Sequence, residues 1–181
     1  MSRVTASLDK YYSHLCRALG SGGALLVSLD EDNRPNAMTI GWAQLGIIWG
    51  KWICTVLVRP SRYTYGCCNA TDDFTVNIPY AEQGDEVLLC GTKSGRDYDK
   101  FAECGFTAAP ARSEAVASPY IAECGVAWEC KVVATSEVVP DCLSAQIAES
   151  SYPGGDYHRI YFGEILGCHV DDDFEEKFGR L

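Results

Sequence analysis

The sequence predicts a mainly β protein: an antiparallel β-barrel with helices appended in the connections between its strands. Predicted strands outnumber predicted helices, and the last two strands alternate apolar and polar residues, as at Trp128, Glu129 and Cys130. Such alternation gives a strand one buried face. Regular strand-helix-strand alternation is missing, which argues against a doubly wound parallel sheet.

The length and composition indicate a single domain spanning residues 1–181. Hydrophobic residues make up 47% of the chain and charged residues 22%, which is enough to bury a sizeable core. No apolar run reaches the roughly 18 residues of a membrane span, and the N-terminus lacks the apolar core of a signal peptide. We therefore expect a cytoplasmic protein. The net charge of −10 disfavours nucleic acid and anionic membranes as partners, because both bind basic surfaces.

Ten cysteines are present, but their spacing indicates neither a metal site nor a disulfide framework. The sequence has no Cys-x-x-Cys pair and only three histidines to complete a zinc site. Without an export signal, most of these thiols are expected to be small buried apolar residues. Cys67 and Cys68 are adjacent in a predicted helix, where their side chains point apart, so we expect them to serve packing rather than redox chemistry.

The first part of the chain is expected to hold one helix and three strands. Leu8, Leu15 and Leu19 lie at helical spacing ahead of Gly20, a suitable C-terminal stop. Apolar segments separated by polar turns then indicate strands. These elements are a helix over residues 8–19 and strands over 24–29, 36–42 and 45–58, the last bending near its glycines.

The remainder is expected to hold two further helices and four strands. The strand at 73–78 ends at Pro79, which cannot continue a sheet ladder. The connection at 140–156 is expected to contain a helical turn and a flexible Pro-Gly-Gly tip. In chain order the elements are helix 61–69, strand 73–78, helix 82–90, and strands near 113–116, 125–138 and 158–170.

The segment from Arg59 to Tyr65 combines the features of an anion site. Pro60 ends the preceding strand, and Ser61 is a suitable N-cap for a short helix. Backbone N–H groups at the helix start would suit a phosphate, together with hydroxyls from Ser61 and Thr64 and guanidinium groups from Arg59 and Arg62. The alternative is an ordinary capped helix with solvated arginines.

A second polar turn, at residues 91–95, carries the same kinds of donor. It supplies hydroxyl groups, backbone N–H groups and a lysine. Alone it would be a solvated loop between two helices. Five of the basic residues nevertheless gather in two short windows of an acidic chain, residues 59–65 and 91–101, which indicates a small anionic ligand. They are Arg59, Arg62, Lys93, Arg96 and Lys100.

Five blocks, in order, resemble the flavoredoxin and flavin reductase-like family. They are NAMTIGW at 36–42, VRPSRYTY at 58–65, FTVNIP at 74–79, SGRD at 94–97 with KF at 100–101, and HRIYFGE at 158–164. The resemblance implies an FMN-binding split β-barrel of antiparallel Greek-key type. It also implies a homodimer with the flavin near the subunit interface.

The resemblance also assigns residues to parts of the cofactor. Asn36, Met38 and Thr39 match the segment beside the isoalloxazine ring, with Trp42 on the same strand; Met38 and Trp42 would otherwise be core residues. His158 matches a histidine near the ring and the nicotinamide, and would otherwise be a solvated edge residue. The implied phosphate and ribityl contacts are Arg59, Ser61, Arg62, Tyr63 and Thr64 from the first turn and Ser94 and Lys100 from the second.

The function implied by the resemblance is that of a flavin-dependent oxidoreductase. NADH or NADPH would deliver hydride to bound FMN, and electrons would pass to a flavin or a protein acceptor. The chain has no convincing nucleophile and base pair, which fits chemistry supplied by a cofactor. Two alternatives remain: an FMN-containing electron carrier that does not turn over nicotinamide, and a non-catalytic barrel that binds another phosphorylated ligand.

Overall fold

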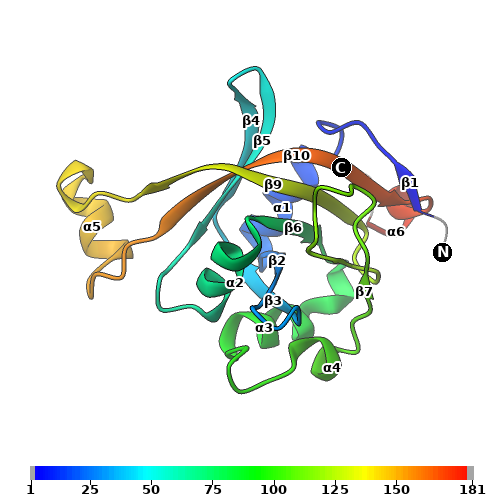
Figure 1. Cartoon of the computed structure of the whole chain (residues 1–181), viewed down its shortest axis with the longest axis horizontal. Helices are drawn as coiled ribbons and strands as arrows, with labels where there is room; N and C mark the ends of the chain where they lie inside the picture. The colour runs from blue at the N-terminus through cyan, green and yellow to red at the C-terminus, as the bar shows by residue number, and fades with distance from the viewer. Residues whose placement is uncertain (1–2, 179–181) are drawn as a thin grey trace.

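A computed structural model describes residues 3–178, and its centre is a large antiparallel sheet (Figure 1). The strand order is β3-β2-β6-β9-β10-β5-β4, and β1 pairs with β10. The strands are β1 Arg3–Thr5, β2 Ala24–Leu29, β3 Pro35–Ile40, β4 Ala43–Ile48, β5 Lys51–Val58, β6 Asp73–Ile78, β9 Val126–Glu137 and β10 Arg159–Asp171, with β7 Ala108–Ala109 and β8 Tyr120–Ile121 in a separate two-stranded sheet.

Most of the helices lie in the connections between strands, as the sequence predicts, and α6 follows the last strand. They are α1 Tyr12–Ser21, α2 Tyr63–Thr71, α3 Gly84–Thr92, α4 Lys100–Cys104, α5 Ala145–Ser151 and α6 Phe174–Phe178, with the 3₁₀ turns η1 Ala81–Gln83 and η2 Pro140–Cys142. None of the helices in the described part of the chain is long and apolar enough to cross a membrane.

The prediction of a mainly antiparallel β fold is confirmed, whereas a closed barrel is not. The strand order runs from β3 at one edge to β4 at the other, and no ladder joins these two edges within residues 3–178. The sheet is therefore open. The predicted Greek-key arrangement remains a prediction.

Strand β2 lies in the most deeply buried part of the sheet. All six of its residues are buried, so both of its faces are covered. Leu26 packs into the cluster that contains Phe74 and Trp128, whereas Leu25 packs into a second cluster with Phe101 under α3 and α4. Because successive side chains of a strand point to opposite faces, the two clusters lie on opposite sides of β2.

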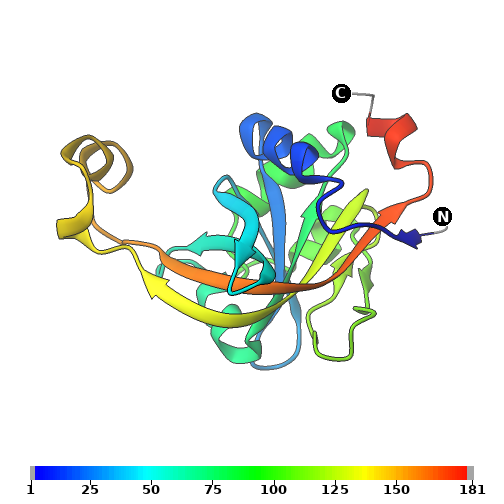
Figure 2. The ribbon, with the colours of Figure 1, turned by 90° about the horizontal axis from the view of Figure 1, so that it is seen from above.

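A long arm extends from the sheet between β9 and β10. We call residues 138–158, which join these strands and include η2 and α5, the arm. Figures 1 and 2 show α5 at the outer end of the paired strands β9 and β10, on one side of the molecule. Near this end, Glu137 pairs with Arg159. The predicted connection with a helical turn is confirmed, and it contains more helix than the sequence indicated.

The segment predicted as one bent strand over 45–58 is a hairpin. Trp49 and Gly50 form the turn between β4 and β5, with φ angles of 54° and 71°. Positive φ at both central residues is what a type I′ hairpin turn requires, and glycine adopts it without a Cβ penalty. The hairpin stands out from the sheet in Figure 1.

The predicted strand near 113–116 is wrong. The backbone N–H groups of Arg112 and Ser113 donate to the buried carboxylate of Glu129, at 2.7 and 2.9 Å. Those of Ala117 and Ser118 donate to Asp73, at 2.8 and 3.0 Å. Two carboxylates on the sheet therefore satisfy the donors that a strand ladder would have used.

Candidate functional site

One cavity of about 190 Å³ brings together half of the predicted site residues. We call it the central pocket. It lies where the ends of β3 and β5 meet the chain before α2 and the last residue of the arm. Six of its lining residues were predicted to belong to the site: Met38, Thr39, Trp42, Arg59, Arg62 and His158; Ile40, Gly41 and Leu57 complete the lining.

Larger hollows adjoin the central pocket on two sides. A groove of about 530 Å³ along β4, β5 and β10, here called the strand groove, shares Trp42 and Leu57 with it. On the other side Arg62 also lines a hollow of about 470 Å³, which shares Tyr63 with a cavity of about 380 Å³, here called the turn pocket. Asn36 and Lys100 line the turn pocket. The hollows together reach the 300 to 1,000 Å³ typical of ligand clefts.

Arg59 holds the arm against the central pocket. Its guanidinium donates to the backbone oxygens of Ser151 at 2.7 Å, Asp156 at 3.1 Å and Gly155 at 3.4 Å, and lies over the ring of Tyr152 at 5.0 Å. A planar guanidinium with several donors suits such a cluster of carbonyls. Two of its nitrogens are therefore engaged within the protein, although the residue was predicted to bind phosphate.

Arg62 differs from Arg59 because its side chain is exposed and makes no hydrogen bond or ion pair within residues 3–178. It is the N-cap of α2, in an extended conformation, and no side chain caps this helix start. The helix begins at Tyr63, so the predicted N-cap role of Ser61 is wrong. An uncapped helix start beside an unpaired guanidinium combines two sources of positive potential.

His158 is a buried, neutral imidazole at the edge of the central pocket. Its Nδ1 lies 2.8 Å from the hydroxyl of Tyr152, and its ring centroid lies 4.8 Å from that of Trp42. Burial lowers the pKa of His158 to about 4, and the nearby Arg59 charge acts in the same direction. The imidazole is therefore uncharged at neutral pH, with Nε2 left to contact a ligand.

The two predicted anion-binding turns contact each other. The side-chain amide of Asn36 donates to Thr64 Oγ1 at 2.8 Å, and Arg96 Nη1 donates to the backbone oxygen of Ser61 at 3.2 Å. A Cβ on Gly95 would lie 2.1 Å from Asn36 Oδ1 and 2.6 Å from the ring of Tyr63. Only a glycine permits this close approach of the second turn to the first.

Lys100 is buried and points inward. It is 5% exposed, and its Nζ donates to the backbone oxygens of Ala37 at 2.8 Å and Cys90 at 2.9 Å. Burial lowers its pKa. The ammonium therefore ties the second turn to β3 and α3, and it lines the turn pocket rather than the central pocket.

The predicted hydroxyl groups are engaged within the protein. Ser61 Oγ donates to Asp156 of the arm at 2.5 Å, and Thr39 Oγ1 donates to the backbone oxygen of Val87 at 2.5 Å. The Tyr63 hydroxyl donates to Asp30 at 2.9 Å. Ser94 Oγ accepts from the backbone N–H of Arg96 at 3.2 Å. These contacts fix the two turns in place.

Tyr152 and Asp156 were not among the predicted site residues. Both lie in the arm, on either side of the Pro-Gly-Gly tip that the sequence indicated as flexible. Tyr152 is only 5% exposed and contacts Arg59, Trp42 and His158. Such burial is unusual for a flexible loop. The aromatic residues just before the last strand were the available signal.

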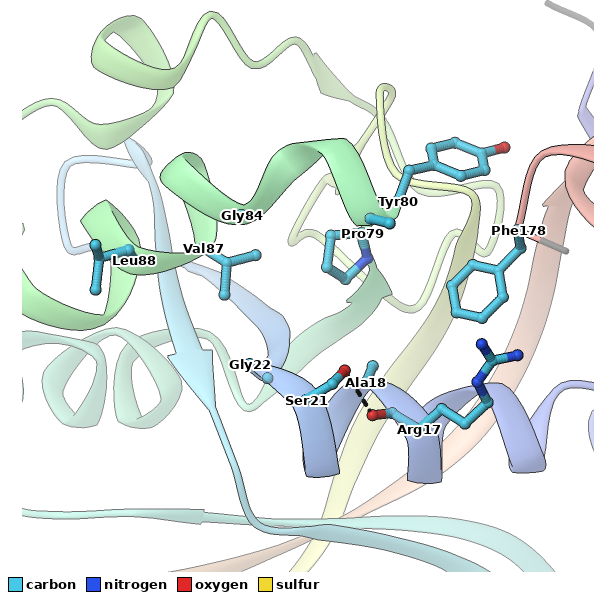
Figure 3. Close-up of a pocket in the computed structure, with 12 residues that line it drawn as sticks. Arg17, Ala18, Ser21, Gly22, Pro79, Tyr80, Gly84, Val87, Leu88 and Phe178 are labelled. Atoms are coloured by element: carbon cyan, nitrogen blue, oxygen red, sulfur yellow. Dashed lines mark hydrogen bonds between the residues drawn. The ribbon is translucent and has the colours of Figure 1, made fainter.

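A separate cavity of about 500 Å³ lies between α1 and the η1–α3 segment (Figure 3). Its walls are mostly apolar, and Ser21 Oγ donates to the backbone oxygen of Arg17 at 2.8 Å beside it. None of the predicted site residues is among its described lining: Arg17, Ala18, Ser21, Gly22, Gly23, Pro79, Tyr80, Ala81, Gly84, Val87, Leu88 and Phe178.

Most of the cysteines are buried, as predicted. Cys67 and Cys68 are 1% and 0% exposed, and burial raises their pKa values to about 11 and about 12. Thiols of this kind are poor nucleophiles at neutral pH. Both lie on the buried face of α2, and Cys68 packs into the core cluster that contains Phe74 and Trp128, so a packing role agrees with the prediction.

Comparisons relate the chain to known proteins. The family model described as flavin reductase like domain matches residues 16–180. The flavoredoxin of Desulfovibrio vulgaris (Miyazaki F) is 27% identical with a TM-score of 0.65, over 83% of this chain and 69% of that one. A flavoredoxin of Methanosarcina acetivorans is 25% identical with a TM-score of 0.66, over 83% and 68%. An FMN-binding protein of Thermus thermophilus, 18% identical with a TM-score of 0.66 over 97% and 83%, shares the fold. No curated protein matches significantly.

Proposed function

Because the chain belongs to the flavin reductase-like domain family, we propose that it binds FMN and is a flavin-dependent oxidoreductase. It takes hydride from NADH or NADPH and passes electrons to a flavin or a protein acceptor. The observation that carries the proposal is the central pocket, where the unpaired Arg62 at the start of α2 faces the same cavity as Trp42 and the neutral His158.

The phosphate end of FMN would lie at the start of α2. The first N–H groups of a helix and its dipole attract a phosphate, and a guanidinium adds charge-assisted hydrogen bonds. Arg62 supplies that guanidinium, while Arg59 contributes charge and holds the arm. The second turn supports this end through Arg96 and Gly95, which contact the first turn.

The ring end would lie between β3 and the arm. Met38 and Thr39 line one side of the central pocket, and Trp42 and His158 line the other. A Cβ placed on Gly41 would meet no atom within 4 Å, so space is open along this strand. Bound FMN supplies the hydride and electron chemistry. The neutral imidazole of His158 orients the ring or the nicotinamide by a hydrogen bond from Nε2, since Nδ1 bonds Tyr152.

We further propose that a second copy of the chain completes the site. The β4–β5 hairpin exposes large apolar side chains: Ile47 is 58% exposed and Trp49 is 64% exposed. The strand groove beside it shares Trp42 with the central pocket. Exposed apolar clusters of this kind mark protein interfaces. A homodimer through this face would cover the open side of the pocket, where the resemblance also locates the interface.

The first experiment is the visible absorption spectrum of the purified protein before and after FMN is added. Bound FMN is expected to give shifted and structured flavin bands. NADH and NADPH are then added under anaerobic conditions, and bleaching of the bound flavin is the expected result. A colourless protein that does not bind added FMN would contradict the proposal as a whole.

An electron carrier is the second candidate, because a flavoredoxin is 27% identical with a TM-score of 0.65. The anaerobic titration separates the two functions. A carrier would keep its FMN oxidised in the presence of either nicotinamide and would be bleached only by dithionite or by a reduced redox protein. That outcome would reject nicotinamide turnover while keeping FMN binding.

A further inference from the structure

We propose that Cys90 and Cys104 form a thiol pair that closes to a disulfide when the protein meets a hydroperoxide or a small-molecule disulfide. The two residues lie outside the central pocket, and nothing in the proposed function uses them. The inference therefore does not depend on FMN binding. It rests on the distance between the two sulfur atoms, their different exposure and their positions on α3 and α4.

The two sulfur atoms are already in contact. Cys90 Sγ and Cys104 Sγ lie 3.9 Å apart, with Cys90 near the end of α3 and Cys104 as the last residue of α4. A disulfide has an S–S distance of about 2.05 Å. Bond formation requires the two sulfur atoms to approach by a further roughly 2 Å, and both residues lie in the last turns of their helices rather than inside the sheet.

Exposure distinguishes this pair from the other cysteines. Cys54 and Cys130 also interact through their side chains, but both are completely buried, so an oxidant has no access to them. Cys104 is half-buried, whereas Cys90 is 1% exposed. The pair therefore joins a partly exposed cysteine to a protected one, so an oxidant can reach the pair through Cys104, and Cys90 can resolve the product.

The reaction balances as a two-electron oxidation of the thiol pair. The Cys104 thiolate attacks one oxygen of a hydroperoxide, which forms a sulfenic acid and releases an alcohol or, from hydrogen peroxide, water. The sulfur of Cys90 then attacks the sulfenic sulfur, loses its proton and displaces water. Two thiols and one hydroperoxide thus give a disulfide, an alcohol and water. With a small-molecule disulfide, exchange gives the same bond and two released thiols.

Lys100 connects the thiol pair to the second turn. Its Nζ donates to the backbone oxygen of Cys90, and its positive charge lowers the pKa values of both thiols, although burial raises them more. A disulfide would close residues 91–103 into a ring that contains the whole second turn. The closed ring reduces the conformational freedom of residues 91–103 in the unfolded state. Local unfolding of this segment should therefore be rarer in the oxidised protein.

Peptide mapping provides the test, because trypsin cuts between the two cysteines. Protein carrying Cys16→Ser and Cys142→Ser, which removes the two exposed thiols, is treated with hydrogen peroxide or oxidised glutathione, alkylated and digested. The expected product joins peptide 63–93 to peptide 101–112, with a mass lower by two hydrogen atoms than their sum. Dithiothreitol should release both peptides. Fragmentation of the linked product should assign the bond to Cys90 rather than to Cys67 or Cys68.

The matched control is Cys104→Ser, which keeps a small side chain at the half-buried position. It should give no linked product and leave Cys90 fully alkylated after unfolding. Oxidation of Cys104 to a sulfinic acid with Cys90 still reduced would overturn the proposal. So would full alkylation of both residues after an exposure that oxidises the exposed thiols of the unsubstituted protein.

Discussion

Arg62 and Arg59 show how two arginines in one short segment reach different roles. Arg59 is committed to the carbonyls of the arm, whereas Arg62 has no hydrogen bond or ion pair in the described residues. The sequence indicated both as phosphate ligands, because the arm contacts that occupy Arg59 come from residues more than 90 positions away. Arg62 is therefore the residue whose removal should affect the ligand most directly.

Arg62→Ala should weaken FMN binding and leave the fold intact. The loss of one charge-assisted hydrogen bond, about 1.5 to 3 kcal/mol, corresponds to roughly a 10- to 100-fold rise in Kd. Fluorescence titration of FMN measures the change, and thermal unfolding without FMN should be unaltered. Arg17→Ala, at an arginine outside the central pocket, is the matched control. Equal FMN affinities for both variants would remove Arg62 from the site.

The burial of His158 should make stability depend on pH. Its pKa is about 4 in the folded protein and near 6.5 in the unfolded chain, so between these values only the unfolded chain takes up the proton. Stability is therefore expected to fall as pH drops from 6.5 to 4, by at most about 3 kcal/mol. Above pH 6.5, His158 does not make the free energy of unfolding depend on pH.

Urea unfolding at a series of pH values checks this, with His158→Gln as the comparison. Subtracting the two curves removes the contribution of carboxyl groups and of His14, whose pKa burial also lowers. The difference between the two free energies of unfolding should change with pH only between pH 4 and 6.5. Parallel curves over that range would show that His158 is not buried as the structure has it.

Lys100→Met should act mainly by lowering the free energy of unfolding. Its direct effect on the affinity for FMN should be smaller. The substitution leaves the oxygens of Ala37 and Cys90 buried without a donor, and each such loss costs about 1 to 3 kcal/mol. Urea unfolding should show a loss of at least 2 kcal/mol, whereas Lys93→Met at an exposed lysine should change stability by less than about 0.5 kcal/mol. Unchanged stability in Lys100→Met would mean that the ammonium faces outward, as a direct phosphate ligand would.

At the scale of elements, the strands with strong alternation or a clear proline stop were predictable, and the loop of residues 110–119 between β7 and β8 was not. Strand β6 and the two long strands β9 and β10 lie within a residue or two of their predicted bounds. The failure at 113–116 arose because a local apolar pattern cannot show that Asp73 and Glu129 accept the N–H groups. Both carboxylates lie on strands, where alternation alone indicated ordinary sheet positions.

The same limit applied to the candidate site. The cluster of Thr39, Trp42, Arg62 and His158 in one pocket followed the predicted blocks. The bond from Ser61 to Asp156 spans 95 positions, so helix propensity alone pointed to the wrong N-cap. Tyr152 was missed for the same reason, because its burial depends on Arg59 in a distant strand.

Glu129→Gln should loosen the loop of residues 110–119. Burial alone would raise the pKa of Glu129, but the nearby imidazole of His169 and the hydrogen bonds from the backbone N–H groups of Arg112 and Ser113 lower it, so the group is an ionised carboxylate. An amide cannot accept from all these donors, and the mismatch should cost about 1 to 3 kcal/mol. Hydrogen exchange should rise within residues 110–118. Glu114→Gln, at an exposed carboxylate in the same loop, should leave hydrogen exchange unchanged. Equal exchange rates in the two variants would show that Glu129 does not hold this loop in place.

At the scale of the whole molecule, the exposed face of the β4–β5 hairpin should hold two copies together. Light scattering is expected to give the mass of a dimer, twice 19.8 kDa. Trp49→Ser removes a side chain that is 64% exposed and should shift the equilibrium toward the monomer by at least 10-fold in Kd, about 1.4 kcal/mol. Leu88→Ser, at a residue 63% exposed on α3, should leave the mass unchanged. If the unsubstituted protein has the mass of a monomer, a second subunit does not contribute to the site.

The contacts of Arg59 with the arm also determine the stage of protein synthesis at which the central pocket can form. They join residues 92 to 97 positions apart, and β10, which pairs with both β5 and β9, is the last strand of the sheet. Residues up to and including β10 must therefore be synthesised before the wall of the central pocket exists. Domains fold as units once their sequence is available. A chain truncated before β10 would therefore lack the contacts between Arg59 and the arm, and with them one wall of the proposed cofactor site.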